Sequence, residues 1–374
     1  MAKLPELCEI QYGYAFDSAC FTEDNTHLPL VRIRDVKRGY SETFYSGNYP
    51  SDYVIDSGNL LVGMDGEFNI ARWKGGHALL NQRVCKITAK ENVNEEYIRF
   101  ALSKALKEIE NRTAFVTVKH LSAKELNQLE IDIPNYTTQT DVARVLTQIE
   151  SIISARQQQL QKLDELVKAR FVEIFGIYPA NPKGWETGTI RDVVSDVRYG
   201  SSRPAVDGGK YPYLRMNNIT YGGELDLSDT KRIDIPDNEL DKCTVRRGDV
   251  LFNRTNSKEL VGKTCVYNRD DMMVLAGFVI RVRVSERILP EFLSEFLNIE
   301  FSKQMLLAMC KTAIGQANIN AQEMQNIGLY LPPIELQRKF VQFKGQTDKS
   351  KVAVQKALDE AQLLFDSLMQ KYFG

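Results

Sequence analysis

Sequence patterns for metal binding, disulfide bonding and common catalytic chemistry are scarce in this chain. Its six cysteines show no C-x-x-C spacing, and its three histidines are isolated from one another. We therefore expect neither a structural zinc site nor a disulfide framework, and we interpret the cysteines as small reduced core or surface residues. The sequence also lacks a G-x-x-x-x-G-K-S/T phosphate loop and a G-x-S-x-G nucleophile elbow.

Long apolar runs and an excess of one charge are missing as well. The longest uncharged apolar run, Met272–Ile280, is about half of the roughly 20 residues that a membrane helix needs. Glu6 and Glu9 interrupt the stretch where a signal peptide needs its apolar segment, so we expect a cytoplasmic protein without a membrane partner. Lysine and arginine number 48 against 49 aspartate and glutamate, a net charge of −1. Any nucleic-acid binding must therefore rely on local basic patches.

An internal repeat organises the 374 residues, a length that predicts two domains or slightly more. Residues 121–134 match residues 319–332 position by position, apolar on apolar, at a constant offset of 198. The offset holds through Gln139 and Gln337 to the end of each copy, and it drifts upstream. The upstream pairs are Tyr12-Gly13 with Tyr199-Gly200, Val31-Arg32 with Leu214-Arg215, and Gly58–Leu61 with Gly248–Leu251. Each half is therefore a globular part with variable loops followed by a segment of fixed length.

The fixed segment of the first half predicts one long helix. Between Asp141 and Phe175 there is no proline or glycine, and apolar residues recur at alternating spacings of four and three, which is typical of a coiled-coil seam. A helix of about 35 residues is about 52 Å long, and Thr137 and Thr138 are its candidate caps. The predicted helix–helix interface consists of Ile153, Leu160, Leu163, Val167, Val354, Leu358, Ala361 and Phe365.

The second copy of this helix, 339–373, has a weaker start. Thr347 and Lys351 occupy seam positions close to Gly345, so we expect fraying or a looser contact there. Two copies of one unit in a chain predict a pseudo-two-fold arrangement, with the helices antiparallel and one globular part at each end. The alternative is that each helix packs on its own domain.

Each globular part is predicted to be of the α+β class, because short β-branched and aromatic runs alternate with amphipathic stretches. The predicted strands are 30–33, 59–62 and 83–88 in the first half and 213–216, 250–252 and 279–284 in the second, and the predicted helices are 97–110 and 291–307. The predicted domains are a globular part at 1–140, a helix at 141–176, a linker at 177–186, a globular part at 187–338 and a helix at 339–374.

Basic clusters are the best candidates for a binding function. Residues 242–263 carry six cations against two acidic residues and include the string Asn253–Lys258. That string combines phosphate-seeking cations with arginine and asparagine, which pair with guanine and adenine edges. The candidate DNA-contacting residues of the second half are Arg198, Ser201, Ser202, Arg203, Arg215, Asn217, Asn218, Asn253, Arg254, Asn256, Lys258 and Gln316.

The corresponding stretch of the first half, 63–74, is less basic. Its acidic residues Asp65 and Glu67 are suited to accept a hydrogen bond from a cytosine amino group. The candidate DNA-contacting residues of this half are Arg32, Arg34, Lys37, Asn69, Arg72, Lys74 and Lys119. A charged, solvated loop is the alternative for any single cluster. Because the clusters recur at corresponding places with different residues, we favour two readers of different sequences.

Several strings together resemble the specificity subunit of type I restriction-modification systems, over nearly the whole chain and in the order of its parts. They are the pair Leu30–Val36 and Tyr213–Ile219, the strand signal Gly248–Arg254, the strings Gly315–Ile319 and Leu329–Gln337, and the two terminal helices. The family often has Glu-Gln where this chain has Leu336-Gln337 and Thr138-Gln139. The first half has residues 116–120 in place of Gly-Gln-Ala-Asn. The resemblance therefore does not fix the individual DNA contacts of that half.

The resemblance implies a non-catalytic subunit whose two target recognition domains each read one half of a split site in double-stranded DNA. It implies that the paired helices act as a ruler and as a docking surface for two methyltransferase subunits, and through them for restriction subunits. S-adenosylmethionine, ATP and magnesium are then expected on the partner subunits, with no cofactor or metal in this chain.

Two other functions stay open on the sequence alone. One is a self-contained DNA methyltransferase or nuclease with a diverged centre. The nearest strings, 331–334 and 236–242, depart from the methyltransferase tetrapeptide in residue type and from a nuclease cluster in spacing. The other is a coiled-coil interaction protein that does not bind DNA.

Overall fold

The computed structural model describes residues 1–112, 120–313 and 316–374 of the chain, without the side chains of 311–313 and 316. The chain forms two compact units. The first comprises Met1–Gln157 together with Gln355–Gly374, and the second comprises Gln158–Val354.

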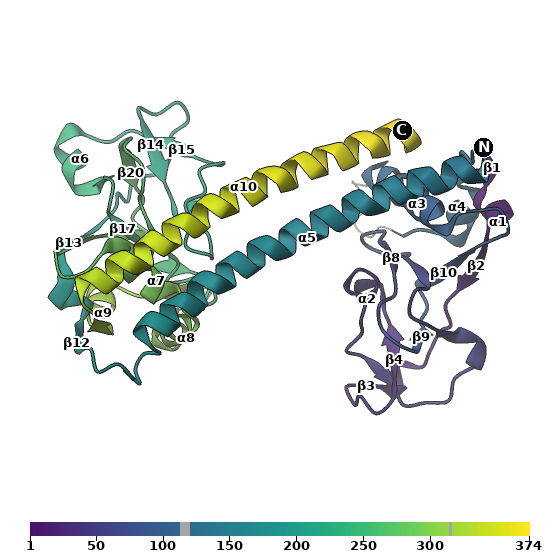
Figure 1. Cartoon of the computed structure of the whole chain (residues 1–374), viewed down its shortest axis with the longest axis horizontal. Helices are drawn as coiled ribbons and strands as arrows, with labels where there is room; N and C mark the ends of the chain where they lie inside the picture. The colour runs from purple at the N-terminus through teal and green to yellow at the C-terminus, as the bar shows by residue number, and fades with distance from the viewer. Residues whose placement is uncertain (113–119, 314–315) are drawn as a thin grey trace. The chain divides into compact units, whose positions relative to one another are not determined.

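Each unit contains a globular part and portions of two long helices, α5 (Tyr136–Phe175) and α10 (Ile334–Phe373), as Figure 1 shows. The first unit takes the beginning of α5 and the end of α10, and the second takes the end of α5 and the beginning of α10. The two helices therefore run antiparallel within each unit. Both begin earlier than the predicted starts at 141 and 339.

The globular part of the first unit contains two sheets with strand orders β2-β10-β7-β8 and β3-β5-β4-β9-β6, and a short pair β1-β11. The strands are β1 (Ala2–Lys3), β2 (Cys8–Tyr12), β3 (Phe21–Thr22), β4 (Leu28–Val31), β5 (Phe44–Tyr45), β6 (Val54–Ile55), β7 (Leu60–Gly63), β8 (Ile70–Arg72), β9 (Ala78–Leu80), β10 (Val84–Ala89) and β11 (Glu130–Ile131). The helices are α1 (Leu4–Leu7), α2 (Ile33–Arg38), α3 (Glu95–Arg112) and α4 (Ala123–Gln128).

The globular part of the second unit repeats this plan, with two sheets of strand orders β13-β21-β17-β19 and β15-β14-β20-β16. It also has a short pair β12-β24 and a three-stranded sheet β18-β23-β22. The strands are β12 (Glu186–Thr189), β13 (Val194–Tyr199), β14 (Tyr211–Leu214), β15 (Lys231–Ile233), β16 (Thr244–Val245), β17 (Val250–Asn253), β18 (Thr255–Asn256), β19 (Thr264–Val266), β20 (Met273–Leu275), β21 (Val279–Val284), β22 (Lys311–Ala313), β23 (Gln316–Asn318) and β24 (Gly328–Leu331). The helices are α6 (Asp237–Cys243), α7 (Pro290–Asn298), α8 (Glu300–Met309) and α9 (Ala321–Gln325).

Matching glycines show how closely the two units correspond. A Cβ atom built on Gly13 would lie 2.0 Å from the carbonyl oxygen of Asn81, and one built on Gly200 would lie 2.1 Å from that of Leu275. Both positions therefore admit only glycine, because the backbone of a neighbouring segment crosses there. The repeat seen in the sequence as two Tyr-Gly pairs is thus a shared crossing of strands.

Buried glutamines hold the starts of the long helices in both units. The Gln139 side chain accepts a hydrogen bond from the N–H of Asn94 at 2.8 Å and donates to the carbonyl oxygen of Pro134 at 2.8 Å. Gln337 makes the same pair of bonds with Leu289 and Pro332, also at 2.8 Å. These bonds join the start of α5 to the residue before α3, and the start of α10 to the residue before α7.

The core of the first unit includes the far end of α10. Met369 is buried with Ile98 and Leu102 of α3 and Leu146 of α5, and Phe365 packs against this cluster. In the second unit, Phe171 and Phe175 of α5 are buried with Phe292 and Phe340. Each long helix is therefore part of both cores.

All residues of the predicted helix–helix interface are buried or half-buried, whereas Ile152, Leu166 and Leu363 on other helix faces are exposed. Val167 belongs to the core of the second unit, and Phe365 packs on that of the first. Direct contact between the other interface residues stays a prediction.

The expectation of fraying near Gly345 is wrong, because α10 is continuous through this glycine. Thr347 is buried, with its hydroxyl donating to the carbonyl oxygen of Phe343 at 3.1 Å. The Lys351 ammonium group forms an ion pair with Asp164 of α5. Polar seam positions are thus satisfied locally, which keeps the helix intact.

Several predicted element bounds are also corrected. Ile33 begins α2 rather than ending a strand, because the N–H of Arg32 donates to Asp35 at 2.9 Å in a capping box. Asn135, not Thr137 or Thr138, caps α5 and accepts from the N–H of Thr138 at 2.9 Å. Met216 lies in a 3-10 turn after β14.

The helix predicted over 291–307 is in fact two helices, α7 and α8. Ile299 has an extended backbone (φ −67°, ψ 155°) between them. Beside it, the Asn298 amide donates to the carbonyl oxygens of Thr264 at 2.7 Å and Ser294 at 2.9 Å. Amphipathic periodicity continues across such a break, so the pattern alone does not reveal it.

Candidate DNA-binding surface

Three segments that are distant in the sequence meet beside the end of β17 in the second unit. The N–H of Arg254 donates to the carbonyl oxygen of Phe278 at 3.0 Å, and the N–H of Ile319 donates to that of Arg254 at 2.9 Å. Thr255 pairs with Asn318 between β18 and β23. We call the surface made of Tyr199, Arg254, Thr255, Phe278 and Asn318 the second junction.

The first unit has the same backbone arrangement with other side chains. The N–H of Met64 donates to the carbonyl oxygen of Arg83 at 2.8 Å, and the N–H of Leu121 donates to that of Met64 at 2.7 Å. Asp65 and His120 form an isolated antiparallel bridge. We call the surface made of Met64, Asp65, Arg83 and His120 the first junction.

Arg254 is oriented by an aromatic ring rather than by a carboxylate. Its guanidinium carbon lies 4.9 Å from the ring centroid of Tyr199, whose hydroxyl accepts a hydrogen bond from the N–H of Ala321 at 2.9 Å. Its Nη1 donates only a long hydrogen bond, 3.4 Å, to the carbonyl oxygen of Gly277. The neighbouring Phe278 ring is 52% exposed. An arginine stacked in this way keeps donors available for a ligand.

Unpaired polar atoms gather at the second junction. Arg254 Nε, Thr255 Oγ1 and Asn318 Oδ1 are buried and have no hydrogen-bond partner among the described residues. Each such atom costs about 1–3 kcal/mol, and native proteins satisfy most of them. A ligand that supplies donors and acceptors would remove this cost.

Three predicted DNA-contacting residues are buried, and their side chains form hydrogen bonds within the fold. Ser201, Asn218 and Asn253 are 4%, 1% and 0% exposed. The Ser201 hydroxyl accepts from the N–H of Arg203 at 3.2 Å, Asn218 accepts from the N–H of Arg215 at 2.8 Å, and Asn253 donates to a loop carbonyl. Direct contact of these side chains with bases stays a prediction, since most of their polar groups bond within the fold, while Asn253 Oδ1 has no partner among the described residues.

Five predicted arginines form ion pairs within the chain, one of them Arg34 with Asp35 at 3.7 Å. Arg203 donates to Glu239 at 2.8 and 3.2 Å, and these bonds hold the pKa of Arg203 above and that of Glu239 below the usual values. The other pairs are Arg198 with Asp196 at 2.9 Å, Arg215 with Asp229 at 2.8 Å, and Arg72 with Glu95 at 2.8 Å and with Glu96. Exposed pairs of this kind are weak because water screens them, so phosphate can compete for Arg198 and Arg203.

Arg72 is the most constrained of these arginines. It joins β8 to α3 through both glutamates and donates to the carbonyl oxygen of Gly58 at 2.6 Å. Burial lowers its pKa, but the hydrogen bonds to Glu96 and Glu95 raise it by more. Its guanidinium is thus already used inside the unit.

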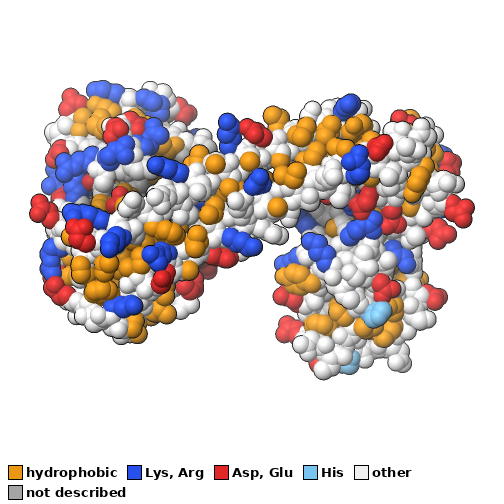
Figure 2. All heavy atoms as spheres, in the orientation of Figure 1, with side chains coloured by type: hydrophobic (Ala, Val, Ile, Leu, Met, Phe, Trp, Pro, Cys, Tyr) orange, Lys and Arg blue, Asp and Glu red, His pale blue; other side chains and the backbone are white. Residues whose placement is uncertain are grey.

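The other candidates stay predictions. Arg32, Arg34, Lys37, Lys74, Ser202, Asn217 and Lys258 are exposed, and Asn69 and Asn256 are half-buried. Lys119 lies outside the described residues, and so does the side chain of Gln316, whose backbone is in β23. Figure 2 shows Lys and Arg side chains gathered over the part of the second unit around α6 and β13.

Sequence reasoning missed Tyr199, Phe278 and Asn318 in the second junction and Arg83 and His120 in the first. These residues belong to no local cluster of cations, and long-range backbone pairing brings them to the surface. The repeat offers one signal, because Tyr199 aligns with Tyr12 and Arg254 with Met64.

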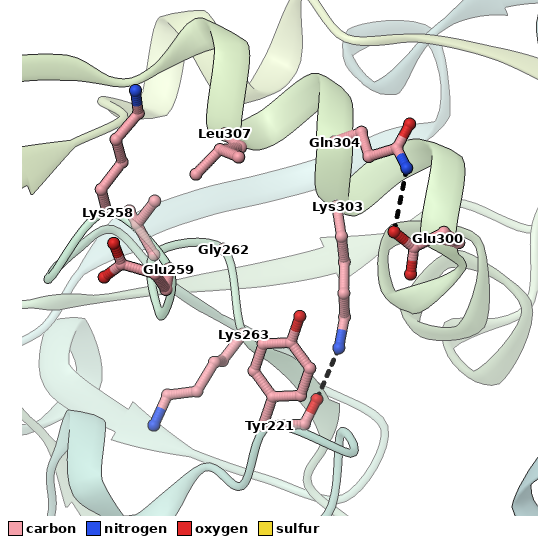
Figure 3. A pocket seen from close by; sticks show the side chains of 10 residues that line it. Tyr221, Lys258, Glu259, Gly262, Lys263, Glu300, Lys303, Gln304 and Leu307 are labelled. Atoms are coloured by element: carbon pink, nitrogen blue, oxygen red, sulfur yellow. Dashed lines mark hydrogen bonds between the residues drawn. The ribbon is translucent and has the colours of Figure 1, made fainter. Parts of the chain in front are cut away.

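A separate cavity of about 210 Å³ lies between Tyr221 and α8 in the second unit (Figure 3). Lysines line it, but their ammonium groups do not converge. Lys303 donates to the carbonyl oxygen of Tyr221 at 2.7 Å, Lys263 donates to that of Met216 at 3.0 Å, and Lys258 points away from both. Burial lowers the pKa of Lys303 to about 8. Lys303 and Lys263 therefore serve the local structure.

Comparison with known proteins identifies the family. Residues 1–165 and 182–361 match the model of the type I restriction modification DNA specificity domain, which covers most of the chain. The chain belongs to this family. The resemblance inferred from the sequence is therefore confirmed, as is the α+β fold with two long antiparallel helices.

Curated relatives of this chain are specificity subunits of type I restriction enzymes. The EcoBI specificity subunit of Escherichia coli is 27% identical and aligns with 99% of this chain and 84% of its own length. The EcoKI specificity subunit of Escherichia coli strain K12 is 20% identical over 93% of this chain and 82% of its own length. Neither a self-contained methyltransferase or nuclease nor a DNA-independent interaction protein is supported.

Solved structures show the same fold. The S subunit of a type I restriction-modification system from M. genitalium has a TM-score of 0.59 at 14% identity, covering 100% of this chain and 95% of that one. A chain from a structural study of complex assembly and conformational transition of the type I R-M system has a TM-score of 0.55 at 18% identity, covering 100% and 96%. Across the described part of this specificity subunit, the helices are all too short or too polar to span a membrane.

Proposed function

We propose that this specificity subunit reads a bipartite site in double-stranded DNA, with one half-site contacted by each unit, and that it has no catalytic centre of its own. The observation that carries the proposal is the second junction. There, the guanidinium of Arg254 is stacked on a tyrosine ring and Phe278 is exposed. Three buried polar atoms of the same surface, one of them Arg254 Nε, lack hydrogen-bond partners among the described residues.

Base edges in the major groove would meet the needs of these atoms. Arginine donors pair with guanine O6 and N7, and asparagine pairs with adenine. The exposed Phe278 ring offers an apolar contact of the kind that thymine methyl groups accept. Since the first junction has the same backbone but different side chains, the two half-sites are expected to differ in sequence.

The long helices are proposed to be the docking surface for two methyltransferase subunits and, through them, for restriction subunits. Exposed apolar residues support this. Leu363 and Leu364 of α10 are 72% and 50% exposed in the first unit, and Val352 is 71% exposed in the second. Figure 2 shows such orange side chains along the helices. Isolated surface leucines are common, but several on one long helix favour a partner.

The partner subunits are proposed to carry S-adenosylmethionine, ATP and magnesium. This assignment follows from the family, and the chain's own residues contribute base recognition and assembly. The cytoplasmic location expected from the sequence stays a prediction.

Co-expression of the chain with methyltransferase subunits, followed by methylation mapping on genomic DNA, tests the proposal. We expect a split motif with an unspecified centre, because two separate units read it. Methyl transfer by the purified chain alone would contradict the non-catalytic role. A complex without salt-dependent DNA affinity would contradict DNA recognition.

A further inference from the structure

Three charged or titratable side chains converge at the first junction. Arg83 Nε lies 3.4 Å from Asp65 Oδ2, and the His120 ring is hydrogen-bonded through Nδ1 to Asp65 Oδ1. Arg83 Nη1 lies 3.3 Å from the His120 ring nitrogens. The side chains are 27% exposed for Asp65, 52% for Arg83 and 44% for His120. The cluster is therefore braced from within and still open to solvent.

Arg83 has an unusual backbone for an arginine. Its φ of 72° is in the left-handed region, which the structure otherwise gives to asparagines and glycines among the described residues. Asparagine adopts this conformation readily because its short side chain bonds locally, whereas arginine has no such compensation. Strained residues of this kind concentrate at binding sites. Arg83 lies at the turn before β10, with its guanidinium beside Asp65.

The same places in the second unit carry neutral side chains. Asp65 and His120 form a backbone bridge, and Thr255 and Asn318 form the equivalent pair in the second unit. The carbonyl oxygen of Arg83 accepts a hydrogen bond from the N–H of Met64. In the second unit, the carbonyl oxygen of Phe278 accepts one from the N–H of Arg254 in the same way. At these three places the second junction has a hydroxyl, a phenyl ring and an amide, whereas the first junction has a carboxylate, a guanidinium and an imidazole. Such a difference at an equivalent backbone site is expected if the two junctions bind different ligands.

We infer that the Asp65–Arg83–His120 cluster determines the half-site specificity of the first unit by reading a C·G base pair, an inference that rests on the proposed function. An ionised carboxylate has about four acceptor positions, so the contacts with His120 and Arg83 leave room for a cytosine amino group. Arg83 Nη2 has no partner among the described residues and can donate to guanine O6 or N7. His120 is a positioning residue that holds Asp65.

The competing explanation is that the cluster is a surface ion pair that only ties the junction together. Such a role predicts weaker folding without any change in base preference. Base preference at one position of one half-site is therefore the decisive measurement.

The test uses the chain in complex with methyltransferase subunits and maps methylated sites for the wild type and variants. Asp65→Asn preserves shape but replaces an acceptor with a group that also donates. We expect at least a ~10-fold loss of preference for C·G at one position of one half-site, with the other half-site unchanged. Arg83→Ala should relax the same or the adjacent position.

Two matched controls accompany these variants. Glu42→Gln removes another exposed ion pair of the first unit, with Arg38, and should leave the motif unchanged. Thr255→Val alters the equivalent position of the second unit and should affect only the other half-site. Melting temperatures of all variants separate folding effects from recognition.

The possible outcomes separate a failure of the proposed function from a failure of the base assignment. A wild-type complex that methylates no split site contradicts the proposed function and this inference with it. A wild-type split motif that stays identical in Asp65→Asn and Arg83→Ala contradicts the inference alone. A uniform loss of methylation, with lower melting temperature and unchanged base preference, also overturns it, because it assigns the cluster to folding.

Discussion

The guanidinium of Arg254 lies over the ring of Tyr199, with 4.9 Å between the guanidinium carbon and the ring centroid. The tyrosine is itself braced, since its hydroxyl accepts from the N–H of Ala321 at 2.9 Å. Arg203, by contrast, points its donors at Glu239. Among the predicted arginines of the second unit, Arg254 is thus the one whose orientation is set by stacking.

Arg254→Ala is expected to cost about 1–3 kcal/mol of discrimination at one guanine of the second half-site. Tyr199→Ala should give a smaller loss in the same direction, and Tyr199→Phe should retain most of the preference because the ring remains. Competition between cognate and altered sites for methylation by the complex measures this. Arg269→Ala, which removes an exposed pair with Asp271, is the control. Unchanged discrimination in Arg254→Ala would remove this residue from the contact surface.

Phe171→Ala should lower the free energy of unfolding of the second unit by about 3–5 kcal/mol. The ring is fully buried, with ring centroids 5.3 Å from Phe292 and 5.2 Å from Phe340, so its loss leaves a cavity between α5, α7 and α10. Denaturant titration measures the effect. Leu166→Ala, at an exposed position of the same helix, should change stability by only about 0.5 kcal/mol or less. Equal effects of the two substitutions would contradict the packing described here.

Lys303→Met should change how stability depends on pH. Burial, followed by the charge of Lys168, lowers the pKa of Lys303 from 10.5 to about 8. Between these values the unfolded chain holds a proton that the folded chain has released, so the wild type gains stability as pH rises from about 8 to 10.5. The variant lacks this gain.

Denaturant unfolding of both proteins across this range measures the difference. Lys263, whose pKa burial also lowers, is present in both proteins and cancels. A stability difference that does not vary with pH would show that Lys303 is not desolvated as described.

The buried cysteines should resist alkylation in the folded protein. Burial raises the pKa of Cys8, Cys85 and Cys265 to about 12, so at pH 8 they remain protonated and inaccessible. Half-buried Cys20 and Cys310 should react first with iodoacetamide, as peptide mass spectrometry can show. All six should react after denaturation. Modification of Cys85 or Cys265 in the folded state would contradict their placement.

The long helices and the repeat were predictable because their signals are local and periodic. Apolar spacing over 141–175 and a constant offset of 198 need no tertiary information. Their starts were missed because side chains outside the periodic run decide them. Asn135 caps α5, and Gln139 ties it to Asn94, a residue far upstream.

The candidate site was predictable only as a region. The string Asn253–Lys258 identifies the right loop, but composition does not distinguish Asn253, which is buried, from Arg254, which is stacked and open. Arg83 and Tyr199 join the surface through long-range strand pairing. Ion pairs are also invisible to sequence reasoning. Arg72 was predicted to contact DNA, but in the structure Glu95 and Glu96 of α3 pair with it.

The end of α10 completes the core of the first unit, where the ring of Phe373 lies 5.0 Å from that of Tyr97. A ribosome makes these residues only after it has synthesised the whole second unit. The half synthesised first is therefore the half that finishes folding last, and a premature stop after Val354 would damage the N-terminal reader while sparing the C-terminal one.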